Sequence, residues 1–300
     1  MKKALFYLLS IVMLPGLSNA QVYSPYTQGA VSYLNLEESS ALVRSNLETN
    51  GFQILGEYQP AGDKERWLIV ISSDELLAAA AKTGGLAGFA AALRVALTNE
   101  SGNVNISYTT PEYWLNAYYR DDYDKVRSTL APVSVRLTEV MKESGSFSGK
   151  AFGSEKGLEA GDLRTYRYMV GMQRFHNTNK MGDFSSYQEA IDKIESSLIK
   201  GVPDVKKVYS VEIPGKEIKL YGFSLAGENG ESHFLPIIDI TEPKHTAFLP
   251  YELLVDGNEV HMLHGRYRIA LSFPDLTMGT FTKIMSAPGD IKDLLKSVVE

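Results

Sequence analysis

The first part of the chain has the pattern of a helix followed by strands. The apolar residues Leu36, Val43 and Leu47 recur at helical spacing. Asn35 suits the N-cap of this helix and Gly51 its end. Two β-type runs follow, "FQILGEY" and "RWLIVIS". This order predicts a helix packed on a small sheet.

A short helix, a hairpin and a longer helix are expected next. Ser73 is suited to cap the Ala-rich helix, which ends at Gly84. The stretch "LRVALTNESGNVNISYTTP" alternates around a turn at Ser101-Gly102 and predicts a hairpin. Helical spacing then continues to Val140, and Pro132 is expected to kink or divide that helix.

A boundary is visible in the middle of the chain. Residues 142–162 read "KESGSFSGKAFGSEKGLEAGD", which is rich in Gly, Ser and charge and has no sustained apolar period. Such a composition is typical of a loop or linker. We therefore expect a first unit over 21–150, a linker over 151–162 and a second unit over 163–300.

The second unit repeats the order of the first. "RTYRYMVGMQRF" predicts a strand, and "SSYQEAIDKIESSLIKG" predicts a helix with Ser185 and Gln188 as its capping box. Two strands, "VKKVYSVEI" and "KEIKLYGFSL", come next. Residues 227–265 read as an insertion, which contains "FLPIIDIT", a strand with Asp239 on its exposed face, and a hairpin "YELLVDGNEVHML". A terminal helix is expected in "GDIKDLLKSVV".

Two stretches of the chain are similar in sequence. "LRVALTNESGNVNISYTTP" is echoed by "YRIALSFPDLTMGTFTKIMSAP", with Arg94 and Arg268 each inside an apolar run. Both copies have a Gly followed nine positions later by a Pro, at 102–111 and 279–288. The pattern predicts an α+β fold made by tandem duplication. Its two related units would each be a small, mainly antiparallel sheet packed with helices, docked together as a pseudo-dimer.

The first unit resembles a known family. Its segments "LEESSALVRSNLETNGFQILGEYQPA" and "LRVALTNESGNVNISYTTPEYW" are similar to the domain of unknown function 302 family. Members of that family pair a helix, Gly-Phe and a strand with a later hairpin that ends in Ser-Tyr-x-x-Pro. The second unit resembles a diverged, enlarged relative, with Ile284-Met285 in place of Ser-Tyr. The resemblance implies a compact α+β module and supplies no activity.

The first twenty residues have the pattern of a secretory signal peptide. Lys2 and Lys3 precede an apolar run, and Ser18-Asn19-Ala20 provides small residues for cleavage. We expect a periplasmic or secreted protein without a transmembrane segment after cleavage. Loss of both lysines leaves 28 basic against 36 acidic residues, a net charge of −8, which argues against nucleic acid as a partner. The chain has no Cys and therefore no disulfide framework.

Candidate chemistry in the chain is sparse. No motif for catalysis, nucleotide binding or a cofactor is found, and we expect no cofactor. All five histidines follow residue 162, although without the spacing of a metal motif. Those retained as metal candidates are His233, His245, His261 and His264.

A second set of candidates is aromatic or cationic. Tyr113, Trp114 and Tyr118 fall in "PEYWLNAYYRDDY", where rings can line a ligand groove or partner interface, or pack the helix on the sheet. Arg94 and Arg268 alternate away from their apolar neighbours, which favours a solvent-facing or interface position over an anion site.

Three classes of function stay open. The favoured one is a noncatalytic exported module that binds a small molecule or an envelope protein. The alternatives are a metal-handling protein that uses the histidines of the second unit, and an enzyme whose site is assembled only in three dimensions. We expect any ligand site to lie in the second unit.

Overall fold

The computed structural model describes residues 21–300, and two antiparallel sheets dominate it. The first sheet has six strands in the order β3-β4-β5-β6-β2-β7. Their bounds are β2 Tyr26–Ser32, β3 Gln53–Tyr58, β4 Arg66–Ser72, β5 Leu93–Glu100, β6 Asn103–Thr109 and β7 Ser146–Phe152. The four predicted strands β3, β4, β5 and β6 are confirmed.

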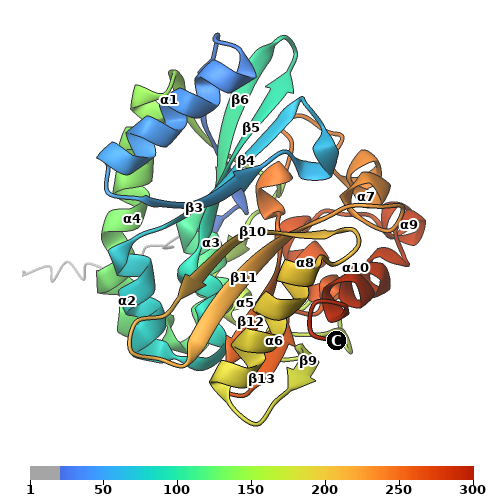
Figure 1. The fold of residues 1–300 in the computed structure, drawn as a ribbon. Coiled ribbons are helices and arrows are strands. Elements are labelled where there is room, and N and C mark those ends of the chain that lie inside the picture. Colours follow the sequence, from blue (N-terminus) through green and yellow to red (C-terminus); the bar gives the residue numbers. More distant parts are fainter. Residues whose placement is uncertain (1–20) are drawn as a thin grey trace, which may run out of the picture.

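Helices cover one face of the first sheet, as Figure 1 shows on its left side. They are α1 (Leu36–Thr49) and α4 (Tyr123–Glu143), and α2 (Asp74–Thr83) packs on α4. The predicted caps are confirmed, because Asn35 accepts from the Glu38 amide and Ser73 from the Leu76 amide. Pro132 lies inside α4 without dividing it.

The second sheet has five strands in the order β10-β11-β12-β13-β9. Its strands are β9 Asn179–Asp183, β10 Val205–Glu212, β11 Ile218–Leu225, β12 Tyr251–Asp256 and β13 Glu259–Met262. Helices α6 (Tyr187–Lys200) and α10 (Ala287–Lys296) pack on it. The predicted hairpin is confirmed, and Gly257 at its turn has the positive φ of 58° that favours glycine.

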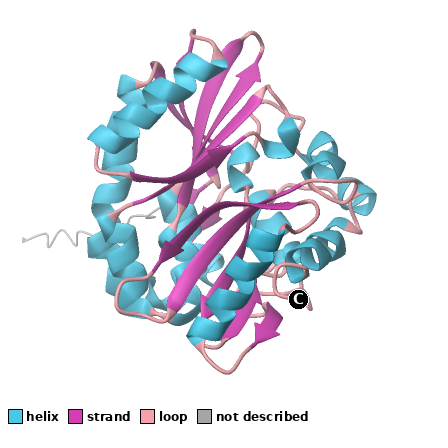
Figure 2. Cartoon of the chain, in the orientation of Figure 1, coloured by secondary structure: helices cyan, strands magenta, loops and turns pink. Residues whose placement is uncertain are grey.

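Shorter elements connect these layers (Figure 2). A two-stranded sheet pairs β1 (Val22–Tyr23) with β8 (Leu158–Glu159). The remaining helices are α3 Pro111–Tyr119, α5 Ala160–Arg164, α7 Glu231–Ile238, α8 Gly265–Ser272 and α9 Met278–Lys283. The 3-10 turns are η1 Pro60–Gly62, η2 Gly85–Ala91, η3 Arg120–Asp122 and η4 Thr246–Phe248.

The two halves have the same order of elements. Apart from η1, which lies between β3 and β4, the first runs β2-α1-β3-β4-α2-η2-β5-β6 and the second runs β9-α6-β10-β11-α7-η4-β12-β13. The strand orders also correspond, because β3-β4-β5-β6-β2 matches β10-β11-β12-β13-β9. The α+β architecture of two related, mainly antiparallel units is therefore confirmed.

The correspondence between Arg94 and Arg268 is wrong. Arg94 lies on strand β5, whereas Arg268 lies on helix α8. The counterpart of β5 is β12, so residues 227–265 are not an insertion. They contain the counterparts of α2, η2, β5 and β6. The alternation in "YRIALS" wrongly indicated a strand. Helix α8 is buried on nearly all sides, so its sequence lacks the helical spacing of apolar residues that marks a half-exposed helix.

Three further expectations fail around the middle of the chain. Residues 146–152, predicted as loop, form edge strand β7, which pairs with β2. "RTYRYMVGMQRF" forms the end of α5 and a series of turns instead of a strand. The expected strand "FLPIIDIT", residues 234–241, instead begins within helix α7, which ends at Ile238. The secondary structure of these segments depends on long-range contacts. Neither the Gly/Ser-rich composition nor the local apolar pattern indicates such contacts.

The halves pack closely against each other. Edge strands β3 and β10 lie together, and a Cβ at Gly56 would collide with the Val208 carbonyl. Turn η2 packs on β11 and β12, where Gly88 lies against Leu254 and Ile218, while η4 packs on β4, β5 and β6. Each half thus places the turn before its second hairpin on the sheet of the other half.

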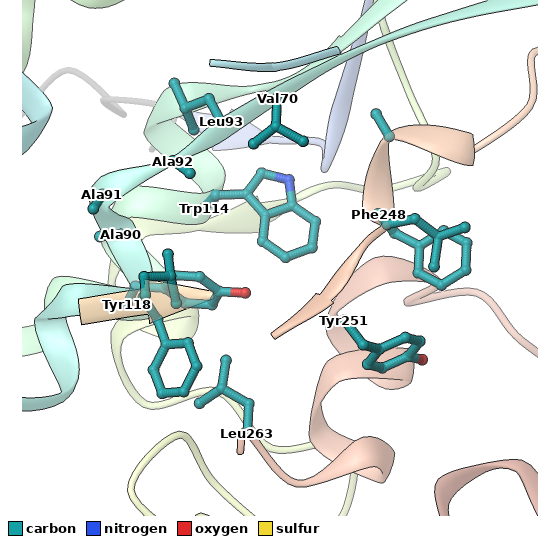
Figure 3. Packing of buried hydrophobic residues seen from close by; sticks show 14 of the residues in the cluster. Val70, Ala90, Ala91, Ala92, Leu93, Trp114, Tyr118, Phe248, Tyr251 and Leu263 are labelled. Atoms are coloured by element: carbon teal, nitrogen blue, oxygen red, sulfur yellow. The ribbon is translucent and has the colours of Figure 1, made fainter. Parts of the chain in front are cut away.

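Side chains from both halves fill the space between the sheets (Figure 3). Trp114 and Tyr118 project from α3 toward Phe248 and Tyr251 of the second half. All four side chains are at most 3% exposed. The apolar core is therefore shared by the two units. Among residues 21–300, no helix combines the length and the apolar character needed to cross a membrane. The expected signal peptide lies outside the described residues.

Candidate functional site

The five residues proposed as ligand or interface candidates lie between the two halves. Arg94, Tyr113, Trp114, Tyr118 and Arg268 are 0–3% exposed. The Tyr113 hydroxyl donates to the Leu271 carbonyl at 2.8 Å, so α3 is tied to α8. The structure gives these residues contacts across the interface and leaves almost none of their surface open to solvent.

A buried ion pair joins the two sheets. The Arg94 guanidinium on β5 pairs with Glu252 on β12, and it also donates to the Ala92 carbonyl at 3.2 Å. The Tyr209 hydroxyl donates to the same carboxylate. Burial, with the Glu252 charge, raises the pKa of Tyr209 well above its usual value. Tyr209 therefore stays protonated and acts as a hydrogen-bond donor.

Arg268 completes this cluster from α8. Its guanidinium donates to the Tyr118 hydroxyl and, at 2.7 Å, to the Phe248 carbonyl, and it lies 3.5 Å from Glu252. It also stacks 5.1 Å from the centre of the Trp114 ring, a cation–π contact. The gap that adjoins the cluster has a volume of about 10 Å³, which is room for a single water. The cluster holds the halves together and has no space for a ligand.

A second buried pair corrects the expectation for Asp239. This residue is 1% exposed rather than solvent-facing, and its carboxylate pairs with Arg66 on β4. The Thr246 hydroxyl donates to the carboxylate at 2.7 Å. Asp239 follows α7 instead of lying on a strand, so alternation did not apply to it.

Glu231 is the buried carboxylate with the most altered acidity. It starts α7 and accepts hydrogen bonds from the Tyr58 hydroxyl at 2.9 Å, the Ala61 amide at 2.8 Å and the Leu225 amide at 3.3 Å. Burial raises the pKa of Glu231 to about 7, although these three donors favour the carboxylate. Tyr58 and Ala61 belong to the first half, so Glu231 also bridges the interface.

The histidine candidates are dispersed over the second half. His233 lies on α7, His261 on β13, and His264 at the N-cap of α8, where its side chain accepts from the Arg266 amide. His245 stacks on Phe273 with ring centres 4.8 Å apart. Within residues 21–300, no group of three or more His, Asp or Glu side chains is placed to hold a metal ion.

The most apolar cavity of the second half has a volume of about 260 Å³. Three segments form its walls: helix α8, helix α9 with the residues after it, and the turn-rich segment 168–172. The lining residues are Tyr168, Met169, Met172, Arg266, Ile269, Ala270, Phe273, Leu276, Met278, Phe281, Thr282 and Met285. Arg266 supplies the only charge among them.

Methionine is concentrated in this cavity. Of the seven methionines in residues 21–300, four line it, and we call these the cavity methionines: Met169, Met172, Met278 and Met285. The other three, which we call the core methionines, are at most 1% exposed: Met141, Met181 and Met262. The pattern of the sequence did not predict this site. Its available signals were the Met169-x-x-Met172 pair and the seven-residue interval from Met278 to Met285.

The apolar walls are open to solvent along one side. Met169, Met278 and Met285 are 48%, 54% and 60% exposed, and neighbouring Val170 is 84% exposed. Exposed apolar side chains grouped in this way mark a binding surface more often than scattered ones do. Two further hollows, which are more polar than the cavity, have volumes of about 470 and 530 Å³. They flank the cavity and share Tyr168, Phe273 and Leu276 with it.

Comparison with known proteins gives little further information. No protein-family model matches the chain, and no curated protein matches it. Among solved structures, the chain is similar to an uncharacterized conserved protein DUF302 from Bacillus stearothermophilus. The two are 12% identical, and the match covers 39% of this chain and 97% of that one with a TM-score of 0.35. This neighbour bears the name of the family that the first unit resembles, and so weak a likeness carries no argument about function.

Proposed function

We propose that this protein is an exported, noncatalytic binding protein that takes an apolar small molecule into the methionine-lined cavity. One observation carries the proposal: four methionines from two segments about a hundred residues apart converge on one open, apolar cavity in the second half. Ligand sites of proteins are typically concave and mainly apolar, with few polar groups. The cavity has this character, because the polar side chains that line it are those of Arg266, Thr282 and Tyr168.

The choice of methionine supports binding of a flexible or variable ligand. Its unbranched, polarizable thioether adapts to different shapes, which is why methionine is common on promiscuous binding surfaces. A stable core does not need such side chains where solvent reaches them. The exposure of Met278 and Met285 therefore favours a surface that is covered when a ligand binds.

The buried titratable groups support a noncatalytic role. A catalytic acid or base is expected in a cleft, with an altered pKa and access to substrate. Glu231 has the altered pKa, yet it does not line the cavity, and both of its oxygens accept hydrogen bonds from the protein. Arg94, Glu252 and Arg268 are likewise engaged with one another.

Export is supported by sequence alone. Lys2, Lys3, the apolar run and Ser18-Asn19-Ala20 form the pattern that signal peptidase recognises. We propose that cleavage after Ala20 releases the mature chain into the periplasm or the medium. Intact-mass measurement of the protein from these fractions tests this step, and a chain beginning at Met1 and confined to the cytoplasm contradicts it.

A second candidate function has one observation in its favour. Thioether sulfur is a soft ligand that selects Cu(I) over harder cations, and four thioethers line a single cavity. A metal-handling role would then use methionines instead of the histidines. Titration with Ag(I), a redox-stable mimic of Cu(I), tests this alternative, because saturation at one ion per chain with loss of apolar-probe binding would favour it.

The principal test uses an environment-sensitive apolar dye with the mature protein. We expect saturable fluorescence enhancement, and roughly tenfold weaker binding by the variant Met278→Gln/Met285→Gln, because polar amides replace two apolar walls. The matched control is Val135→Gln/Ile199→Gln, which alters two apolar side chains outside the cavity that are at least as exposed as the two methionines. Equal effects of both variants, or no saturable binding, would contradict the proposed function.

A further inference from the structure

We propose that the ligand of the methionine-lined cavity is a single-chain amphiphile with an anionic head, whose head is held by Arg266. This inference rests on the proposed function and adds the chemical class of the ligand. It follows from the position of Arg266, from its lack of a protein partner, from the charges around it and from the size of the cavity.

The position of Arg266 places a charge at one end of an apolar wall. Arg266, Ile269, Ala270 and Phe273 all line the cavity. Their spacing of three, four and seven residues puts them on one face of α8 and its C-terminal extension. A ligand that lies along this face would meet apolar side chains over most of its length and a guanidinium at one end.

The guanidinium of Arg266 is not engaged by the protein. In the part of the chain that the structure describes, six arginines form ion pairs with carboxylates: Arg44, Arg66, Arg94, Arg136, Arg164 and Arg268. Within that same part, the Arg266 side chain has neither an ion pair nor a hydrogen bond, although the residue lines a cavity. Arginine is well suited to a carboxylate or phosphate, which it can hold with two parallel hydrogen bonds.

The surroundings of Arg266 are positive although the whole protein is acidic. Burial, followed by the positive charges of Arg266 and Lys292, lowers the pKa of His264. The two positive charges beside His264 would repel a cationic head. Lys292 is exposed and, among residues 21–300, forms no ion pair. An anionic head is therefore favoured over a cationic one.

The volume of the cavity restricts the apolar part. About 260 Å³ lies just below the roughly 300–1,000 Å³ typical of small-molecule sites. That volume suits one alkyl chain and is small for the paired chains of a membrane lipid. Flexible methionine walls also suit a chain without fixed shape, since they can follow its bends.

The test compares three probes with twelve-carbon chains, the two ionic ones below their micelle concentration and the alcohol below its solubility limit. They are dodecanoate, dodecanol and dodecyltrimethylammonium, and each is titrated by displacement of the apolar dye. We expect dodecanoate to bind at least about tenfold more tightly than the other two. Arg266→Gln should remove this preference and leave dodecanol binding unchanged. Arg167→Gln is the matched control, because Arg167 is also exposed but lines a flanking hollow instead of the cavity.

The outcomes separate the two proposals. Binding of all three probes with similar affinity, unaffected by Arg266→Gln, would overturn the anionic head and leave the proposed function standing. Failure of every probe to bind would overturn the proposed function itself. Cosedimentation with phosphatidylglycerol vesicles without binding of free dodecanoate would overturn the single-chain ligand. Thermal unfolding of both arginine variants should match that of the unchanged protein, since both side chains are exposed.

Discussion

Arg94 and Glu252 form an ion pair between corresponding strands of the two halves. Each is the second residue of its strand, Arg94 on β5 and Glu252 on β12, and these strands correspond in the two sheets. The pair therefore joins a strand of one half to its counterpart in the other half. One copy carries the cation and the other the anion, so the charges compensate in a place that solvent does not reach.

Glu252→Gln should strongly destabilise the protein. The substitution leaves Arg94 and Arg268 buried without a counter-charge, and breaking a buried pair in this way costs about 3–5 kcal/mol. Urea unfolding measures the change in the free energy of unfolding. Glu139→Gln is the matched control, because it breaks an exposed pair with Lys142 and should cost less than about 1 kcal/mol. Equal, small effects of the two variants would contradict a role for the pair in docking.

Glu231 should make stability depend on pH. Its pKa is about 7 in the folded protein, against an ordinary value of 4.5. Between these values the folded chain holds a proton that the unfolded chain has released. Its contribution is therefore fully present below about pH 4.5 and is lost as pH rises through 7, by about 3 kcal/mol in total.

Glu231→Gln isolates this contribution, because the amide does not titrate. We expect the free energy of unfolding of the unchanged protein, minus that of the variant, to fall between pH 4.5 and pH 7.5. Other titrating groups cancel in the difference. A difference that is constant over this range, or that rises with pH, would show that the carboxylate is not desolvated at the interface.

Gly56→Ala tests the close contact between the two sheets. A Cβ at this position collides with the Val208 carbonyl of β10, and backbone atoms yield less easily than a flexible side chain. Separation of β3 from β10 should cost about 1–3 kcal/mol. Gly289→Ala is the control, since its Cβ meets nothing within 4 Å in α10 and should stabilise by up to about 1 kcal/mol. A neutral Gly56→Ala would mean that the sheets do not meet there.

Local signals in the sequence predicted local structure well. Asn35 and Ser73 cap the expected helices because an N-cap depends on amides only two or three residues away. The cap of α6 was displaced by one residue, from Ser185 to Ser186. The Glu189 carboxylate accepts from the Ser185 amide, while the Glu189 amide donates to the Ser186 hydroxyl. Both serines therefore belong to the capping interaction, and the sequence pattern alone does not show which one is the N-cap.

Tertiary packing decided what the sequence did not predict. Alternation correctly separated Arg94 from Leu93 and Val95, yet both faces of β5 are buried because the second half covers the face without helices. The methionine-lined cavity was missed for a related reason. Met172 and Met278 are about a hundred positions apart, and no periodic pattern connects segments that meet only when the halves have folded.

Oxidation should distinguish the cavity methionines from the core methionines. Three of the four cavity methionines are about half exposed, whereas the core methionines are at most 1% exposed. Peroxide reaches exposed thioethers first, and it converts each into a polar sulfoxide. Peptide mass spectrometry after mild treatment should therefore find sulfoxide at Met169, Met278 and Met285 before it appears at Met141, Met181 or Met262.

The same oxidation should weaken ligand binding without unfolding the protein. Sulfoxides at the cavity make its walls polar, so the affinity for the apolar dye should fall roughly tenfold, while far-UV circular dichroism should not change. Methionine sulfoxide reductases should restore binding, since they reverse the modification. The Met278→Gln/Met285→Gln variant is the control, because it has already lost two of the reactive walls and should lose little further affinity. If oxidation at these three positions leaves dye binding intact, the ligand does not contact the cavity methionines, and the proposed function is wrong.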